Sequence, residues 1–159
     1  VPRNQDLASN SGSSDLISST EGVLYAEIAS LNNSPAQTMV ISLSNSTINN
    51  TVEIGYTSGT NYARFRIRSN SGLTFAQNIS VSDITQFTKM AIKYKSGDTK
   101  VFINGSQVYS NTTSFSFSDN LMELAFDRGI SSQSFEGKVK CVAVFKEALT
   151  DAELTCLTS

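Results

Sequence analysis

Histidine is absent from the 159 residues of this chain, and cysteine and proline occur only twice each. Without histidine the chain cannot build a Ser–His–Asp triad, and a zinc site is not expected. Its 12 basic residues are outnumbered by 14 acidic ones, so it lacks the cationic excess that binding to nucleic acid phosphates requires. No apolar run approaches the roughly 18 residues of a membrane span. These absences indicate a globular domain whose partner is neither a nucleic acid nor a membrane.

Charged residues make up only 16% of the chain, so Ser, Thr, Asn and Gln must supply much of the surface polarity. This composition is common in extracellular β-proteins and virion fibres. The length suits one domain, whose core needs neither a disulfide nor a metal. The chain starts at Val1 without a signal-peptide pattern, and we expect it to be a fragment, a processed product or an expressed piece of a longer protein. We interpret residues 1–11 as an extended lead-in and residues 12–159 as the domain.

The two cysteines, Cys141 and Cys156, lie in apolar surroundings near the end of the chain. One interpretation is that both are small buried hydrophobic side chains. The other is a disulfide between the last strand and the C-terminal segment. The sequence leaves both interpretations open.

Residues 88–108 show the clearest structural pattern. Met90, Ile92 and Tyr94 alternate with Lys and Ala, and this period of two predicts a strand with one buried face. A Ser-Gly-Asp turn and a second strand follow. Asn104-Gly105 then has the composition of a type I′ hairpin turn. The segment therefore predicts three strands in an antiparallel meander.

Similar short runs, separated by turns rich in Ser, Asn and Gly, occur along the rest of the chain. Thr150 and Glu153 form a capping box, which predicts a short C-terminal helix. The pattern predicts an all-β fold, a two-sheet antiparallel β-sandwich or jelly roll that ends in this helical turn. The other strands are expected at 23–28, 39–43, 52–56, 61–68, 73–81, 115–117, 121–126 and 135–145.

Three segments occur in a distinctive order, namely KMAIKYKSGDTKVFINGSQV, LMELAFDRG and FEGKVKCVAVFKEALTDAEL. This order resembles the laminin-G-like or concanavalin A-like jelly-roll family. The SSDLISSTEGVLYAEI start and the AFDRG segment are similar to a subgroup found in bacteriophage tail fibre proteins and bacterial surface proteins. The resemblance implies a sandwich with one concave sheet, which usually binds glycans and is usually not catalytic.

The most unusual strand is predicted at 61–68, where three arginines recur at every second position. An arginine fork matches a carboxylate or sulfate group, so this face could form a groove for an acidic glycan. The alternative is cross-strand pairing with Glu53 and other carboxylates. Alternation places Tyr62, Arg64, Arg66 and Arg68 on this face and Ala63, Phe65 and Ile67 in the core.

Two further groups of charged residues have competing interpretations. Asp127-Arg128-Gly129 opens a loop that would contact a glycan, or Asp127 would bind calcium together with Asp119 or Asn120. The alternative for Asp127 is a turn carboxylate that caps backbone amides. No other cofactor is expected. A basic patch that protects an exposed sheet is predicted from Lys89, Lys93, Lys95 and Lys100.

The resemblance implies a non-catalytic carbohydrate-binding domain. A glycoside hydrolase is a further alternative, but no Glu-x-Asp-x-x-Glu strand of the kind found in glycoside hydrolases of this fold occurs. The expected partner is a glycan or surface polysaccharide, and the expected setting is a phage tail fibre or another extracellular or cell-surface protein. The alternative is a structural module that packs against other chains of a fibre, for example in a homotrimer. The predicted ligand-binding residues are Tyr62, Arg64, Arg66, Asp127 and Arg128.

Overall fold

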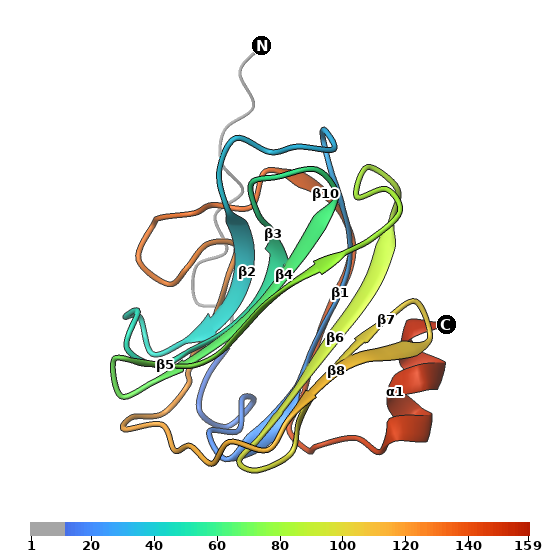
Figure 1. Ribbon diagram of the computed structural model, residues 1–159. Coiled ribbons are helices and arrows are strands. Elements are labelled where there is room, and N and C mark those ends of the chain that lie inside the picture. Colours follow the sequence, from blue (N-terminus) through green and yellow to red (C-terminus); the bar gives the residue numbers. More distant parts are fainter. Residues whose placement is uncertain (1–11) are drawn as a thin grey trace.

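Two antiparallel five-stranded sheets pack face to face in the computed structural model, which describes residues 12–159 (Figure 1). Sheet A has the strand order β10-β1-β6-β7-β8, and sheet B has the order β5-β4-β3-β2-β9. Sheet A contains β1 (Glu21–Ser30), β6 (Thr88–Lys95), β7 (Thr99–Ile103), β8 (Ser106–Asn111) and β10 (Gly137–Phe145). Sheet B contains β2 (Met39–Ser44), β3 (Thr51–Tyr56), β4 (Tyr62–Ser69), β5 (Gly72–Ser80) and β9 (Glu123–Ala125).

This architecture confirms the predicted all-β sandwich. The predicted strand at 115–117 is wrong, because this segment forms no ladder, although Phe115 and Phe117 still pack against the core. The run predicted at 121–126 shortens to the three residues of β9. The predicted lead-in, residues 1–11, lies outside the described residues.

The core lies between the sheets and is built from alternate residues of each strand, as the period of two requires. Phe65 and Ile67 of β4 are fully buried, whereas the arginines that alternate with them point away from the core. Met90, Ile92 and Tyr94 of β6 are buried as predicted. The hairpin between β7 and β8 turns at Asn104 (φ 47°) and Gly105 (φ 79°), which confirms the type I′ prediction.

Helix α1 (Asp151–Thr158) lies against the outer face of sheet A. Thr150 and Glu153 form the predicted capping box at its start. Leu154 packs with side chains of the sheet, so this part of the outer face is a second apolar layer. The helix, the only one in residues 12–159, is too short to cross a membrane. The side chains of sheet A that pack in one cluster with Leu154 are those of Val23, Tyr25, Ala91 and Phe102.

The predicted basic patch on the meander is wrong, because α1 covers the face on which it would lie. Lys93 is only 4% exposed, and its Nζ lies 2.7 Å from Asp98 Oδ2. Lys100 pairs with Asp151 in the first turn of α1, at 2.6 Å. These lysines hold the helix and the β6–β7 turn onto sheet A rather than forming a free cationic surface.

Both interpretations of the cysteines are also wrong, because both thiols are free and exposed. Cys141 lies opposite Glu27 in the ladder between β10 and β1. Its neighbour Val142 packs against the core, so Cys141 must point to the outer face. Cys156 lies on the exposed side of α1.

Three buried tyrosines predict a loss of stability at alkaline pH. Burial raises the pKa of Tyr25 to about 12 and raises the pKa values of Tyr56 and Tyr94 well above their usual range. The hydroxyl groups of Tyr56 and Tyr94 donate to the carbonyls of Ile28 (2.8 Å) and Ser18 (2.9 Å). Above pH 10 the unfolded chain ionises these phenols while the folded chain keeps them protonated, so stability falls as pH rises.

Urea unfolding at intervals from pH 8 to pH 11.5 measures this effect. We expect the free energy of unfolding to be constant up to about pH 9.5 and to fall steadily above the usual tyrosine pKa of about 10. Tyr56→Phe should give a shallower decline, because one of the three groups is removed. An equally steep decline in this variant would contradict the assignment to the buried phenols.

Candidate functional site

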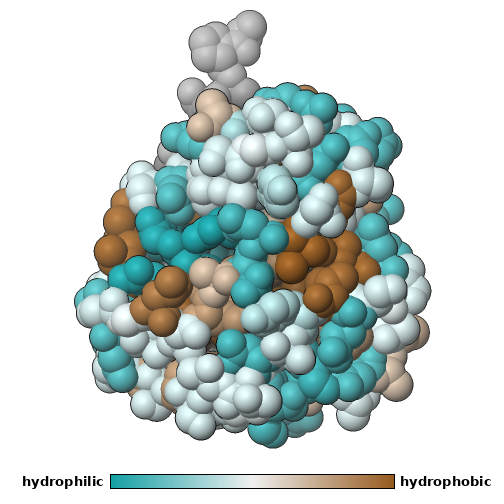
Figure 2. Space-filling model, viewed as in Figure 1, coloured by the Kyte–Doolittle hydropathy of each residue, from teal (hydrophilic) through white to brown (hydrophobic). Residues whose placement is uncertain are grey.

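The outer face of sheet B carries the arginine side chains of β4. Arg66 lies opposite Glu53 of β3, and Glu53 lies opposite Ser42 of β2, so these three residues form one row across the sheet. Arg64 lies in the next row, opposite Gly55 and Asn78. Figure 2 shows strongly hydrophilic surface between apolar patches on the side of the molecule turned to the viewer. The predicted alternation is therefore confirmed, and it places the charged side chains together on one surface.

Glu53 is the centre of this cluster, and its side chain is completely buried. Its Oε1 atom accepts hydrogen bonds from Arg66 Nη2 at 2.6 Å and from the Thr51 hydroxyl at 2.9 Å. Arg128 Nε lies 3.6 Å from the same oxygen. The alternative prediction of cross-strand pairing with Glu53 is thus correct for Arg66.

The other two arginines of β4 have different partners. Arg64 Nη1 donates to Asn78 Oδ1 at 2.8 Å. Arg68 donates to two backbone carbonyls, those of Ile48 at 2.9 Å and Ser71 at 2.7 Å, and so ties two loops together. Arg68 therefore has a structural role, whereas Arg64 forms no ion pair with a carboxylate of residues 12–159.

The cluster has more positive than negative charge. Three guanidinium groups, those of Arg64, Arg66 and Arg128, surround the single carboxylate of Glu53, which leaves a formal excess of two positive charges. Burial, followed by repulsion from Arg66, lowers the pKa values of both Arg64 and Arg128. A second anion at this point would relieve the repulsion, so the electrostatics favour an acidic ligand.

Arg128 reaches the cluster from residues 127–134, which we call the rim loop, between β9 and β10. The rim loop folds over sheet B through the backbone N–H of Val40, which donates to the carbonyl of Gln133 at 2.9 Å. Gly129 (φ 81°) packs so tightly that an added Cβ would lie 2.5 Å from Ser44 Oγ. Ser131 and Gln133 both have φ 55°, in the left-handed region that side chains rarely adopt. Such strained positions concentrate at ligand-binding sites.

Asp127, the remaining predicted site residue of this loop, is buried and caps a turn of the loop. Its Oδ1 atom accepts a hydrogen bond from the backbone N–H of Gly129, as in the alternative interpretation of a turn cap. Asp119 Oδ1 accepts from the N–H of Asn120 in an exposed turn. Within residues 12–159, no three His, Cys, Asp or Glu side chains come together in a group that could hold a metal ion. These contacts fit the turn-cap interpretation, and the predicted contact of Asp127 with a glycan stays a prediction.

Unpartnered buried polar atoms mark the same place. In the described part of the chain, six buried side-chain atoms have no hydrogen-bond partner, and they all belong to residues of this face or of the rim loop. Buried polar atoms of native proteins are nearly always paired, so such a concentration indicates a place where water, an ion or a ligand can bind. The six atoms are Ser42 Oγ, Glu53 Oε2, Arg64 Nε, Arg66 Nε, Arg128 Nε and Gln133 Oε1.

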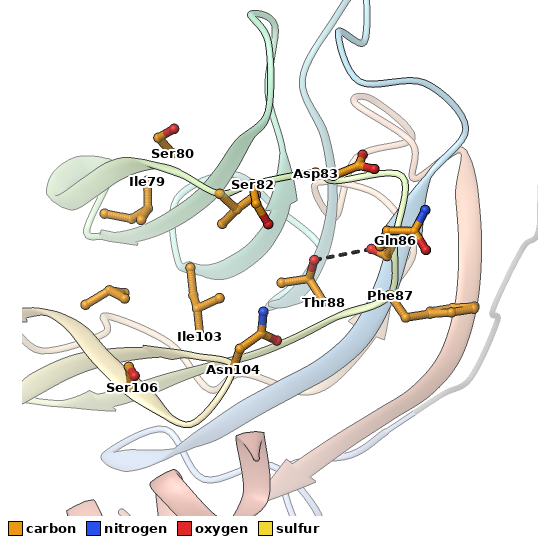
Figure 3. Close-up of a pocket in the computed structure, with 12 residues that line it drawn as sticks. Ile79, Ser80, Ser82, Asp83, Gln86, Phe87, Thr88, Ile103, Asn104 and Ser106 are labelled. Carbon is orange, nitrogen blue, oxygen red and sulfur yellow. Dashed lines mark hydrogen bonds between the residues drawn. The ribbon is translucent and has the colours of Figure 1, made fainter.

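A hollow with a volume of about 290 Å³ opens at the edge of the sandwich, between the β5–β6 link and the β7–β8 hairpin (Figure 3). Ile79 and Ile103 lie on its two sides, and Thr88 donates a hydrogen bond to the carbonyl of Gln86 beside it. None of the six unpartnered atoms belongs to its lining. The outer face of sheet B is therefore the stronger candidate.

The comparison with protein families decides the classification. A family model described as the concanavalin A-like lectin/glucanases superfamily matches residues 11–155. The chain belongs to this superfamily. None of the curated proteins matches the chain.

Solved structures with the same fold include carbohydrate-binding modules. The CBM40 module of the Ruminococcus gnavus IT-sialidase has a TM-score of 0.68 and 13% identity, over 89% of this chain and 84% of that one. The same module has also been solved bound to α2,3-sialyllactose. Domain 4 of AbnA, an extracellular arabinanase from Geobacillus stearothermophilus in complex with arabinotriose, has a TM-score of 0.61 and 15% identity, over 93% and 70% of the two chains. These identities are low, so the likeness establishes the fold of this superfamily member and not its ligand.

Proposed function

We propose that this superfamily member is a non-catalytic carbohydrate-binding domain that holds an acidic sugar on the outer face of sheet B. The observation that carries the proposal is the cluster of Arg64, Arg66 and Arg128 around the single buried carboxylate of Glu53. Each of the three arginines has a buried Nε–H group without a hydrogen-bond partner, although that of Arg128 lies 3.6 Å from Glu53 Oε1. A sugar carboxylate would accept hydrogen bonds from these groups and offset the excess positive charge.

The related modules support a sugar as the carrier of that negative charge. One of them was solved with sialyllactose, which contains a carboxylate, and the other with arabinotriose, which is neutral. The same fold thus accommodates both classes, and the side chains on its surface decide between them. In this chain Tyr62 lies at the start of β4, the strand that carries the arginines, and is 39% exposed. Its aromatic ring offers a face on which a sugar ring could stack.

The charges in the site argue against glycoside hydrolysis. A retaining or inverting hydrolase needs two carboxyl groups on either side of the scissile bond, one of them protonated. Glu53 is the single carboxylate among the three arginines of the cluster, and it pairs with Arg66, so the second carboxyl group is missing there. The solved modules named above are themselves parts of larger enzymes, which fits an attached binding role.

A binding module of this kind would act as part of a larger extracellular or surface protein, since one of the related modules comes from an extracellular enzyme. A phage tail fibre, the setting suggested by sequence resemblance, belongs to this class. The glycan partner would then be a host or cell-surface polysaccharide. Packing into a homotrimeric fibre would instead bury the arginine face, and binding measurements distinguish the two roles.

Calorimetric titration with 3′-sialyllactose, D-glucuronic acid, lactose and arabinotriose tests the proposal. We expect at least one of the two acidic sugars to bind, with an affinity that falls as salt increases, and the two neutral sugars not to bind. Arg128→Gln should weaken binding of the acidic sugar about 10- to 100-fold, because a charge-assisted hydrogen bond is lost. Lys89→Gln, on the opposite sheet, is the matched control for charge and should have no effect. Equal binding of lactose, or an unaffected Arg128→Gln variant, would refute the proposal.

A further inference from the structure

Building on the proposed function, we infer that Gln133 and Ser42 form a neutral wall of the site that recognises a hydrogen-bond donor on the ligand. The site would then prefer an acidic sugar with N–H or O–H groups beside its carboxylate over an anion that can only accept hydrogen bonds. Neither residue is marked by the alternation that identifies the arginine strand. Both belong to the group of buried atoms without a partner.

The six unpartnered atoms divide into two chemical types. Arg64, Arg66 and Arg128 each contribute an Nε–H group, which is a donor only. Glu53 Oε2 and Gln133 Oε1 are acceptors, and Ser42 Oγ takes either role. An inorganic anion would satisfy the three donors and leave the two acceptors buried without a partner, at a cost in affinity. A ligand that carries both an anionic group and donor groups would satisfy both halves.

The position of Ser42 and Gln133 supports a shared role. Ser42 is completely buried and lies directly opposite Glu53 in the ladder between β2 and β3. Gln133 is anchored to the same strand, because its carbonyl accepts a hydrogen bond from the N–H of Val40 at 2.9 Å. The acceptor half of the site is therefore built from β2, the adjacent β3 and the end of the rim loop, beside the arginines.

The backbone of Gln133 gives a second reason to assign it a role in binding. Its φ of 55° is unfavourable for a residue with a side chain, whereas glycine adopts it without steric strain. Ser131 has the same φ in the same loop, but its side chain is exposed. Substituting glycine at either position relaxes the backbone, yet only at Gln133 does it also remove a buried acceptor. The two positions thus form a matched pair for experiment.

The experiment compares Gln133→Gly and Ser131→Gly with the unmodified protein, using sodium sulfate and an acidic sugar as probes. The sugar is 3′-sialyllactose or D-glucuronic acid, whichever binds the unmodified protein more tightly. For Gln133→Gly we expect the affinity for the sugar to fall about tenfold, the affinity for sulfate to change less than twofold, and the melting temperature not to fall. Ser131→Gly should leave both affinities unchanged.

Other results would overturn the inference in distinguishable ways. If Gln133→Gly weakens sulfate and sugar equally, Gln133 only supports the position of Arg128. If it weakens neither, its side chain does not contact the ligand. If the unmodified protein binds sulfate but no acidic sugar, the anion site exists without the predicted selectivity. If it binds neither probe, the proposed function fails together with this inference.

Discussion

Replacing Glu53 with glutamine is expected to lower the free energy of unfolding by about 3–5 kcal/mol. The side chain of Glu53 is fully buried, and that of Arg66, which bonds it at 2.6 Å, is 7% exposed. Glutamine keeps the shape of the side chain but removes its charge. The guanidinium groups of Arg64, Arg66 and Arg128 would then repel one another in a buried site with no carboxylate among them. Breaking a buried ion pair from one side is costly for this reason.

Urea unfolding at pH 7 measures this loss, and Glu123→Gln is the matched control. Glu123 lies on β9 of the same sheet, where its carboxylate accepts a hydrogen bond from the exposed hydroxyl of Ser46. Its replacement should change stability by no more than about 0.5 kcal/mol. The Glu53→Gln protein should also bind sulfate more tightly, because its site has gained a positive charge. A loss below about 1 kcal/mol would show that water screens the cluster in the folded protein.

The sequence was sufficient to predict the fold because the strands of a sandwich have a simple period. Alternation along 61–68 correctly assigned Phe65 to the core and the arginines to the opposite face. The same logic failed for Lys93, whose face of β6 is also covered. Helix α1, far along the chain, lies on that face, and no local pattern in β6 reveals that a helix will cover it. Alternation predicts which side of a strand a residue faces, but not what lies there.

The candidate site could be predicted only in part for a related reason. Arg64 and Arg66 follow from strand periodicity, and their pairing with Glu53 was one of two open interpretations. The approach of Arg128 to Glu53 depends on the path of the rim loop, which turns through left-handed residues such as Gly129. Apart from glycine, residue type gives little warning of such a path. Gln133 was missed because its place in the site depends on this path alone.

Replacing Arg64 with glutamine is expected to move stability and binding in opposite directions. Arg64 forms no ion pair with a carboxylate of the described residues, and burial and repulsion from Arg66 outweigh the attraction of Glu53 and lower its pKa. The neutral amide keeps a polar group near Asn78 while removing one of two excess charges. We therefore expect the free energy of unfolding to rise by about 0.5–1 kcal/mol. The affinity for the acidic sugar should fall about 10- to 100-fold, because one of the donors to its carboxylate is lost.

Arg68→Gln is the matched comparison for Arg64→Gln, because Arg68 is on the same face of the same strand. Its guanidinium bonds the carbonyls of Ile48 and Ser71, so its loss should lower stability by about 1–3 kcal/mol. In the same urea experiment, the free energy of unfolding should thus rise when Arg64, the arginine that serves a ligand, is replaced. It should fall when Arg68, the arginine that serves the fold, is replaced. If Arg64→Gln instead destabilises the protein as Arg68→Gln does, Arg64 belongs to the structure of the sheet. In that case the excess charge of the cluster would have no function in binding.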